Sequence, residues 1–107
     1  MSSVMDAIYT LYSDDDFHRF TYSSIAGYTK VLVDIHGMTC CDAKQFINNA
    51  IAIVSTLSQC PSQMTVIHGY NHGTALQHMV RNDLTNKHIT HRIIDDKNPG
   101  ITRLIIS

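Results

Sequence analysis

Two segments of this 107-residue chain place a histidine and a glycine at the end of a short apolar run. The first segment is Val33-Asp34-Ile35-His36-Gly37, and the second begins at His68-Gly69. Histidine titrates near neutral pH and therefore serves as a general acid or base. Strand alternation would place Asp34 and His36 on one face. A carboxylate beside an imidazole orients the ring and fixes its tautomer, as in the His–Asp half of a catalytic triad. These residues predict proton-transfer chemistry.

The residues after His68 have the composition of an anion-binding loop. Gly69 and Gly73 bracket Tyr70-Asn71-His72, and Thr74 opens a helical pattern. Free backbone N–H groups at a helix N-terminus bind anions, and glycines allow a phosphate to approach the backbone closely. The chain contains neither the P-loop motif G-x-x-x-x-G-K-[ST] nor the dinucleotide motif G-x-G-x-x-G. The sequence therefore predicts a phosphate-sized site beside two histidines.

Alternative interpretations of the same residues remain open. A histidine at a strand end is more often structural than catalytic, and zinc held by His36, His68 and His72 has no supporting local spacing. Cys40, at the start of a predicted helix, is an alternative nucleophile. The three cysteines of the chain have neither disulfide nor zinc-knuckle spacing, which predicts reduced thiols. No metal site is predicted from these patterns.

The elements that must position these residues follow the order β-α-β-α-β-β. Strands are predicted at residues 30–35, 63–68, 89–94 and 101–106, with helices ending near residues 57 and 84. Thr39 is the expected cap of the first helix, with Asp42 three residues later. Right-handed crossovers make the first two strands parallel, and the short last connection makes a hairpin. The predicted fold class is α/β, an α+β two-layer sandwich with a four-stranded mixed sheet.

Composition indicates one small globular domain of residues 30–107 preceded by an N-terminal extension of residues 1–29. Hydrophobic residues make up 44% of the chain and charged residues 16%. The extension holds four aspartates and one arginine, whereas residues 30–107 hold seven lysines and arginines and five aspartates. An amphipathic helix and several aromatic residues in the extension suggest docking on the domain or on a second copy. A mildly cationic domain permits a nucleic-acid partner.

The chain has no apolar run of the roughly 20 residues that a membrane helix needs, so no membrane partner is expected. Its first residues lack the basic region of a secretory signal. The sequence therefore predicts a cytoplasmic protein.

Together these segments resemble the small MutS-related (Smr) domain, as a stand-alone bacterial-type member, over residues 30–107. The segment 33–39 is similar to the family's L-D-x-H-G motif, residues 67–69 and 73–76 to its H-G-x-G loop and helix, and residues 98–102 to its last hairpin. The resemblance implies a sandwich similar to the C-terminal domain of translation initiation factor three. It also implies nucleic-acid binding and, as in several members, endonuclease activity on DNA or RNA.

Carried over by position, the resemblance implies that Asp34, His36 and His68 are catalytic. One histidine would take a proton from water or a ribose 2′-OH, and the other would protonate the leaving oxygen. The implied phosphate-binding residues are Gly37, Gly69, Tyr70, Asn71, His72, Gly73, Thr74, Arg81 and Arg103. The second motif lacks the family's glycine two residues after His-Gly, and Tyr70 stands where a lysine is common.

Three functional hypotheses follow. The first is an Smr-like endonuclease that cleaves or nicks DNA or RNA. The second is a non-catalytic module that binds nucleic acid or a ribosomal surface, and the third is a protein-interaction domain that forms a homodimer through residues 1–29. A divalent cation, Mg²⁺ or Mn²⁺, is compatible with the first hypothesis. The chain contains no glutamate, so a carboxylate metal cluster would need aspartates, of which only Asp34 is suitably placed.

Overall fold

The computed structural model describes residues 19–25, 28–57, 62–69 and 74–107. Its elements, in chain order, are β1 (Phe20–Ile25), β2 (Tyr28–Asp34), α3 (Cys40–Leu57), β3 (Ser62–Ile67), α4 (Ala75–His78), the π-helix η1 (Met79–Asp83), β4 (Ile89–Ile94) and β5 (Ile101–Ile106). From β2 onward this is the predicted β-α-β-α-β-β order. The predicted strands at 89–94 and 101–106 have the predicted bounds.

The sheet has five strands in the order β1-β2-β3-β5-β4. Strands β2 and β3 are parallel, joined by α3, and β4 and β5 form the predicted antiparallel hairpin. The predicted sheet of four strands was one strand short, because β1 pairs antiparallel with β2 at the edge. Strand β1 lies within the segment predicted as an extension. The alternation of Phe20, Thr21, Tyr22 and Ser23 is typical of a strand and is the sequence signal for β1.

Helix α3 follows the segment that contains Asp34 and His36, hereafter called the dyad, and has the predicted length and cap. Its 18 residues make five turns. The Asp42 N–H donates to Thr39 Oγ1 at 3.2 Å, which satisfies one of the free amides of the first turn. Ala43, Ile47 and Val54 are fully buried on its apolar face. This face packs against the sheet in the hydrophobic core.

The second helix differs from the continuous helix that was predicted to end near residue 84. Helix α4 contains only four residues and continues as the π-helix η1. In that wider turn the Leu84 N–H donates to the Met79 carbonyl oxygen at 2.7 Å, five residues earlier. Met79, Val80 and Leu84 are all buried. A five-residue turn brings these apolar residues to the same side, which an ordinary α-turn would not do for Met79 and Leu84.

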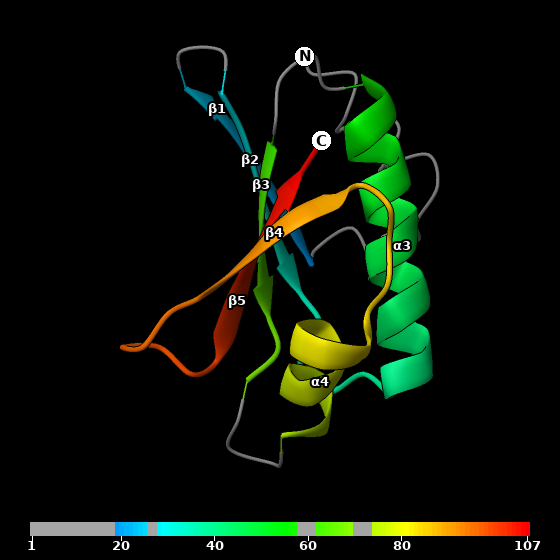
Figure 1. Cartoon of the computed structure of the whole chain (residues 1–107), viewed down its shortest axis with the longest axis vertical. Helices are drawn as coiled ribbons and strands as arrows, with labels where there is room; N and C mark the ends of the chain where they lie inside the picture. Colours follow the sequence, from blue (N-terminus) through cyan, green and yellow to red (C-terminus); the bar gives the residue numbers. More distant parts are fainter. Residues whose placement is uncertain (1–18, 26–27, 58–61, 70–73) are drawn as a thin grey trace.

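The molecule has two layers, with α3 and α4 on the same side of the twisted sheet (Figure 1). The core lies between the layers, where Val33, Ile35, Val66 and Leu104 are fully buried. On the other face of the sheet the described side chains, such as Thr65, are half-buried or exposed. Among the described residues, no helix is long and apolar enough to cross a membrane. The predicted two-layer α/β sandwich is confirmed.

Candidate functional site

Asp34 and His36 form a hydrogen-bonded pair at the carboxyl end of β2. Asp34 Oδ1 lies 2.5 Å from His36 Nδ1 and also accepts the His36 backbone N–H at 3.1 Å. The His36 side chain is 69% exposed and that of Asp34 is 33% exposed. The carboxylate therefore holds the ring through Nδ1, and Nε2 has no hydrogen-bond partner among the described residues. An imidazole fixed in this way can exchange a proton with a bound molecule through Nε2.

The local backbone explains why the ring turns back toward the carboxylate. The Ile35 N–H still donates to the Ile67 carbonyl oxygen, so the pairing with β3 continues one residue beyond β2. Gly37 then adopts φ +81°, a left-handed conformation that favours glycine, and the Met38 N–H donates to Ile35 O. The chain thus leaves the sheet in a tight turn immediately after His36. This turn separates the imidazole from the helix that follows.

Arg19 is a residue of this site that the sequence did not reveal. Its backbone carbonyl oxygen accepts the Asp34 N–H at 2.9 Å. Its Nη1 donates to the carbonyl oxygens of Asp34, at 3.0 Å, and of His36, at 3.2 Å. The contact depends on the pairing of β1 with β2, and the only sequence signal for it was the strand pattern that begins at Phe20.

His68 is buried in a chain of three hydrogen bonds. It is only 4% exposed, and Thr102 is fully buried. Its Nδ1 lies 2.9 Å from the Gly69 carbonyl oxygen, and its Nε2 lies 2.9 Å from Thr102 Oγ1. Arg81 Nε donates to the same Thr102 oxygen at 2.9 Å. Because a carbonyl can only accept, His68 carries its proton on Nδ1, and the Thr102 hydroxyl donates to Nε2.

The two histidines reach the same sheet edge, as predicted, but their side chains leave it on opposite faces. Asp34 pairs with Ile67 across β2 and β3, so His36 lies beside Gly69. A Cβ built on Gly69 would lie 3.8 Å from the His36 Cβ. His36 is level with Gly69 and not with His68, so the side chain of His68 points to the other face, into the core. The prediction placed His36 level with His68, and the register differs from it by one residue.

The predicted phosphate-binding loop is described only in part. Gly69 has φ +72° and lies beside the dyad, and Gly37 is exposed at the turn that follows His36. Thr74 is exposed and directly precedes α4, where it makes no side-chain capping hydrogen bond. Tyr70-Asn71-His72-Gly73 lies outside the described residues. The described part of the predicted phosphate-binding site thus consists of two turn glycines, Gly37 and Gly69, close to His36.

The two predicted cationic residues have partners within the protein. Arg81 donates to Thr102 and, through Nη2, to the Ile101 carbonyl oxygen at 3.0 Å. Arg103 Nη1 pairs with Asp95 Oδ2 at 3.2 Å. The backbone N–H of Lys97 lowers the pKa of Asp95, and the Arg103 guanidinium lowers it further. Arg81 therefore supports the His68 network, and Arg103 supports the hairpin.

The described residues include some of those proposed for the alternative zinc and thiol sites. These residues contain no group of three His, Cys, Asp or Glu side chains that could hold a metal ion. His72, one of the three hypothetical zinc ligands, lies outside them. Cys40 and Cys41 are free thiols, half-buried and exposed respectively, in accord with the prediction of reduced cysteines. Cys60 also lies outside the described residues.

Comparison with known proteins identifies the fold. No known family profile matches the sequence, and no curated protein matches it. The crystal structure of the Smr domain of Thermus thermophilus MutS2 is similar, with a TM-score of 0.62 and 21% sequence identity over 71% of this chain and 96% of that domain. This chain has the Smr fold. The resemblance seen in the motifs is confirmed at the level of the fold, and function must be argued from the site.

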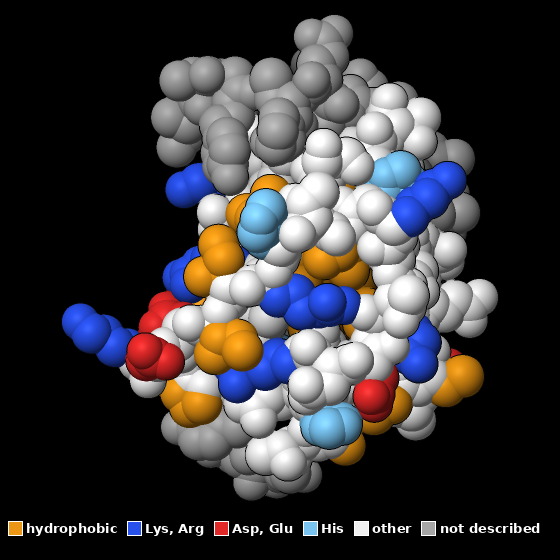
Figure 2. Space-filling view, in the orientation of Figure 1, with side chains coloured by type: hydrophobic (Ala, Val, Ile, Leu, Met, Phe, Trp, Pro, Cys, Tyr) orange, Lys and Arg blue, Asp and Glu red, His pale blue; other side chains and the backbone are white. Residues whose placement is uncertain are grey.

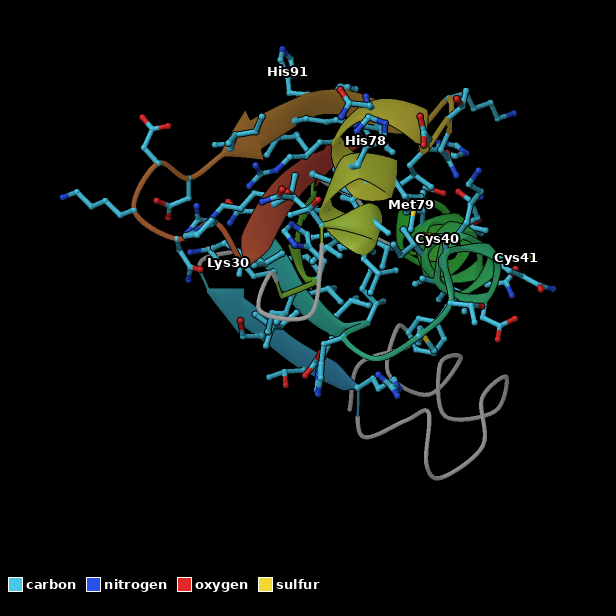
Figure 3. The ribbon with its side chains drawn as sticks, turned by 90° about the horizontal axis from the view of Figure 1, so that it is seen from below. Lys30, Cys40, Cys41, His78, Met79 and His91 are labelled. Atoms are coloured by element: carbon cyan, nitrogen blue, oxygen red, sulfur yellow. The ribbon has the colours of Figure 1, made fainter. Side chains whose placement is uncertain are left out.

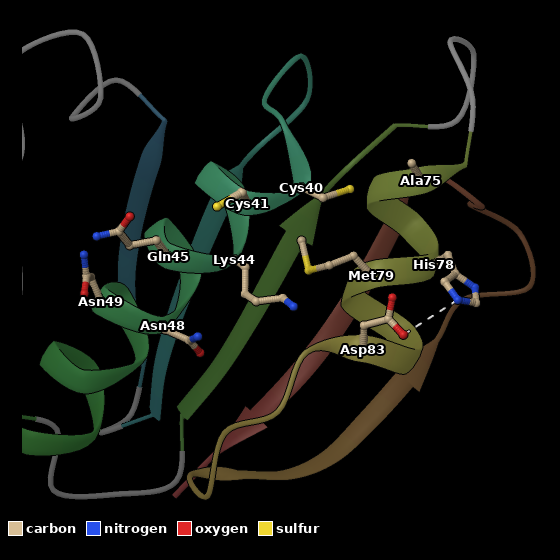
Figure 4. A pocket seen from close by; sticks show the side chains of 10 residues that line it. All are labelled: Cys40, Cys41, Lys44, Gln45, Asn48, Asn49, Ala75, His78, Met79 and Asp83. Atoms are coloured by element: carbon tan, nitrogen blue, oxygen red, sulfur yellow. Dashed lines mark ion pairs between the residues drawn. The ribbon is translucent and has the colours of Figure 1, made fainter.

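A groove of about 730 Å³ on the helical side of this Smr fold lies between α3 and α4–η1 (Figure 4). Lys44 extends from α3 toward Met79 and Asp83 on the opposite wall, where His78 Nε2 lies 3.7 Å from Asp83 Oδ1. Figure 3 shows Cys40, His78 and Met79 together near the helices, away from Lys30. The described residues that line the groove include Cys40, the alternative nucleophile, but none of the predicted catalytic or phosphate-binding residues. The groove is therefore separate from the dyad.

His68 gives the Smr fold of this chain a pH-dependent stability. Burial lowers the pKa of His68 below its usual 6.5, and Arg81 lowers it further, although hydrogen bonding to Gly69 opposes both effects. At pH values between 6.5 and the lowered pKa, His68 binds a proton in the unfolded chain and not in the folded chain. The stabilising contribution is therefore complete above pH 6.5 and is lost as pH falls through this window, with a slope of at most about 1.4 kcal/mol per pH unit.

Urea unfolding at several pH values from 8 to 4.5 would measure this dependence. We expect the free energy of unfolding of the wild type to fall more steeply below pH 6.5 than that of His68→Gln. His91→Gln, which removes an exposed histidine of β4, serves as the matched control and should retain the wild-type slope. Equal slopes for His68→Gln and the wild type would contradict the assignment.

Proposed function

We propose that this chain binds nucleic acid and cuts its phosphodiester backbone, with Asp34 and His36 as the catalytic pair. One observation carries the proposal: the 2.5 Å contact between Asp34 Oδ1 and His36 Nδ1 holds an exposed imidazole at the carboxyl edge of parallel strands. Ligands of α/β proteins bind at such edges. The Smr fold supports the nuclease reading over other uses of a His–Asp pair, since the same residues carry the resemblance to that domain's first motif.

The proposed reaction is the transfer of a phosphoryl group to an oxygen nucleophile. His36 Nε2 removes a proton from water or from a ribose 2′-OH while that oxygen attacks phosphorus. Asp34 keeps the proton on Nδ1 and stabilises the imidazolium that forms. The bond from phosphorus to the leaving oxygen breaks, and this oxygen takes a proton from solvent. His36 then returns its proton to solvent, so the enzyme is unchanged after one cycle.

His68 has a positioning role in this proposal. Both ring nitrogens of His68 are hydrogen-bonded inside the protein, and its backbone carries the turn at Gly69 that lies beside His36. Proton exchange with a substrate would require these bonds to break. We therefore assign the proton transfer to His36 and the placement of the neighbouring turn to His68.

The charge of residues 30–107 is compatible with a polyanionic substrate. These residues hold seven lysines and arginines against five aspartates, whereas the whole chain has a formal net charge of −1 at pH 7. Figure 2 shows Lys and Arg side chains spread over the centre of the face that includes β4. An excess of positive charge over a broad surface attracts a phosphate backbone without sequence preference. Structured RNA, ribosomal RNA included, and DNA are both substrates to be tested.

Cutting and binding by the whole chain test the proposal together. The purified protein is incubated with supercoiled plasmid and with structured RNA, each with EDTA, Mg²⁺ or Mn²⁺, and the products are separated on gels. We expect nicked plasmid or shortened RNA under at least one of these conditions. The cutting activity should elute with the protein in gel filtration. Fluorescence anisotropy should show affinity falling linearly with salt on logarithmic axes, because bound phosphates release counterions. A protein that neither binds nor cuts at low salt would refute the proposal.

A further inference from the structure

Arg19 is held against the backbone that carries the dyad. It lies opposite Asp34 in the register that pairs Phe20 with Val33, and the Asp34 N–H donates to its carbonyl oxygen. Its Nη1 then bridges the carbonyl oxygens of Asp34 and His36. The guanidinium is therefore fixed within hydrogen-bond distance of the residue whose imidazole is catalytic in the proposed function.

The positive charge of Arg19 has no carboxylate partner among the described residues. The ion pairs found there join His36 to Asp34, His78 to Asp83 and Arg103 to Asp95. Among the described residues, the side-chain contacts of Arg19 use Nη1 alone, so within this part of the chain Nε and Nη2 keep their N–H groups for another acceptor. An arginine with a fixed orientation and free donors suits phosphate, whose oxygens accept two parallel hydrogen bonds.

We propose that Arg19 and the exposed edge of His36 form a binding site for a phosphate group of a nucleic-acid strand. The inference rests on the proposed function for the class of ligand, and it adds the residue that holds the phosphate beside the base. The two backbone carbonyls fix the guanidinium before the ligand arrives, so little side-chain freedom is lost on binding. The same charge would stabilise the negative charge that develops on the phosphoryl oxygens during attack.

The proposal gives β1 a functional role. Strand β1 lies in the segment predicted as an extension, yet it delivers a cation to the carboxyl edge of β2. Its hydrogen bonds to β2 set the position of Arg19 relative to Asp34. The phosphate site would therefore be incomplete in residues 30–107 alone.

The test uses full-length variants and a single-stranded, fluorescein-labelled DNA or RNA oligonucleotide in EDTA. Arg19→Gln keeps amide N–H donors for the two carbonyls and removes the charge, whereas Arg19→Lys keeps the charge. We expect Arg19→Gln to bind about tenfold more weakly. The slope of log affinity against log salt should fall in magnitude by about 0.7, which corresponds to one lost phosphate contact on a single strand. Arg19→Lys should retain the wild-type slope.

Lys87→Ala is the matched control, since it removes one exposed cation near Ser107, at the opposite edge of the sheet. Its slope should change less than that of Arg19→Gln, because Lys87 lies outside the proposed phosphate site. A second readout is the NMR shift of the His36 ring nitrogens on titration with inorganic phosphate, which we expect for the wild type and not for Arg19→Gln. Equal slopes for Arg19→Gln and Lys87→Ala would overturn the inference. Binding that depends on Arg19 without any cutting would refute the proposed activity and leave the phosphate site standing.

Discussion

The His36→Ala variant is expected to cut nucleic acid about 10²–10⁴ times more slowly than the wild type and to lose less affinity for it than Arg19→Gln. The side chain is 69% exposed and is absent from the core, so its removal should leave the fold intact. It supplies the ring nitrogen that would take the proton of the nucleophile. Loss of this group raises the barrier of the chemical step and leaves the charges that bind the strand unchanged.

Asp34→Asn should lose a comparable amount of activity, because an amide can hydrogen-bond the ring but cannot stabilise an imidazolium or enforce the Nδ1–H tautomer. Asp34 also accepts the His36 backbone N–H, and asparagine can keep this bond through its own Oδ1, so the loss should come from the ring contact. Two residues that act as one unit are strongly non-additive. The double variant, His36→Ala with Asp34→Asn, should therefore be little worse than His36→Ala alone.

Single-turnover cutting and equilibrium binding, measured for all three variants, separate the chemical step from affinity. His91→Ala removes an exposed histidine from β4 and is the matched control, for which we expect wild-type rates. Multiplicative losses in the double variant would mean that the two residues act independently. Wild-type cutting by His36→Ala would exclude the dyad as the catalyst.

Much of the fold was predictable because strand and helix periods are local. The apolar face of α3, its Thr39 cap and the two strands of the last hairpin follow from residues close in sequence. The π-turn of η1 was not predictable from period, since it depends on how Met79 and Leu84 meet the sheet. Strand β1 was not predicted because its place at the edge of the sheet depends on antiparallel pairing with β2, which its own residues do not reveal.

The contacts of the site show the same difference between local and long-range features. Asp34 ends β2 and His36 follows it by two residues, so the local spacing was enough to predict their contact. The orientation of His68 depends on the register between β2 and β3, where a shift of one residue reverses the face. The Arg19 contact depends on β1 and spans seventeen residues to His36. Pairs that are local in sequence were predictable, and pairs fixed by strand register were not.

Thr102→Val should lower the free energy of unfolding by roughly 2–4 kcal/mol, because it removes two hydrogen bonds inside the protein and replaces neither. Thr102 is fully buried, and its hydroxyl lies between His68 Nε2 and Arg81 Nε, each at 2.9 Å. Valine has nearly the same shape, so packing is preserved while both partners lose a bond. The buried His68 nitrogen is then left without a donor, which is the larger part of the cost.

Thr65→Val is the matched control for urea unfolding, since Thr65 lies one residue before Val66, the β3 partner of Thr102, and on the opposite, half-buried face. Its stability should stay within about 0.5 kcal/mol of the wild type. At a temperature where Thr102→Val is folded, its cutting rate should fall less than tenfold, because neither Asp34 nor His36 is changed. Equal stabilities of the two threonine variants would show that the Thr102 hydroxyl does not hold His68. A loss of cutting as large as in His36→Ala would instead require His68 to take part in the proton transfer itself, since its ring is the group that Thr102 orients.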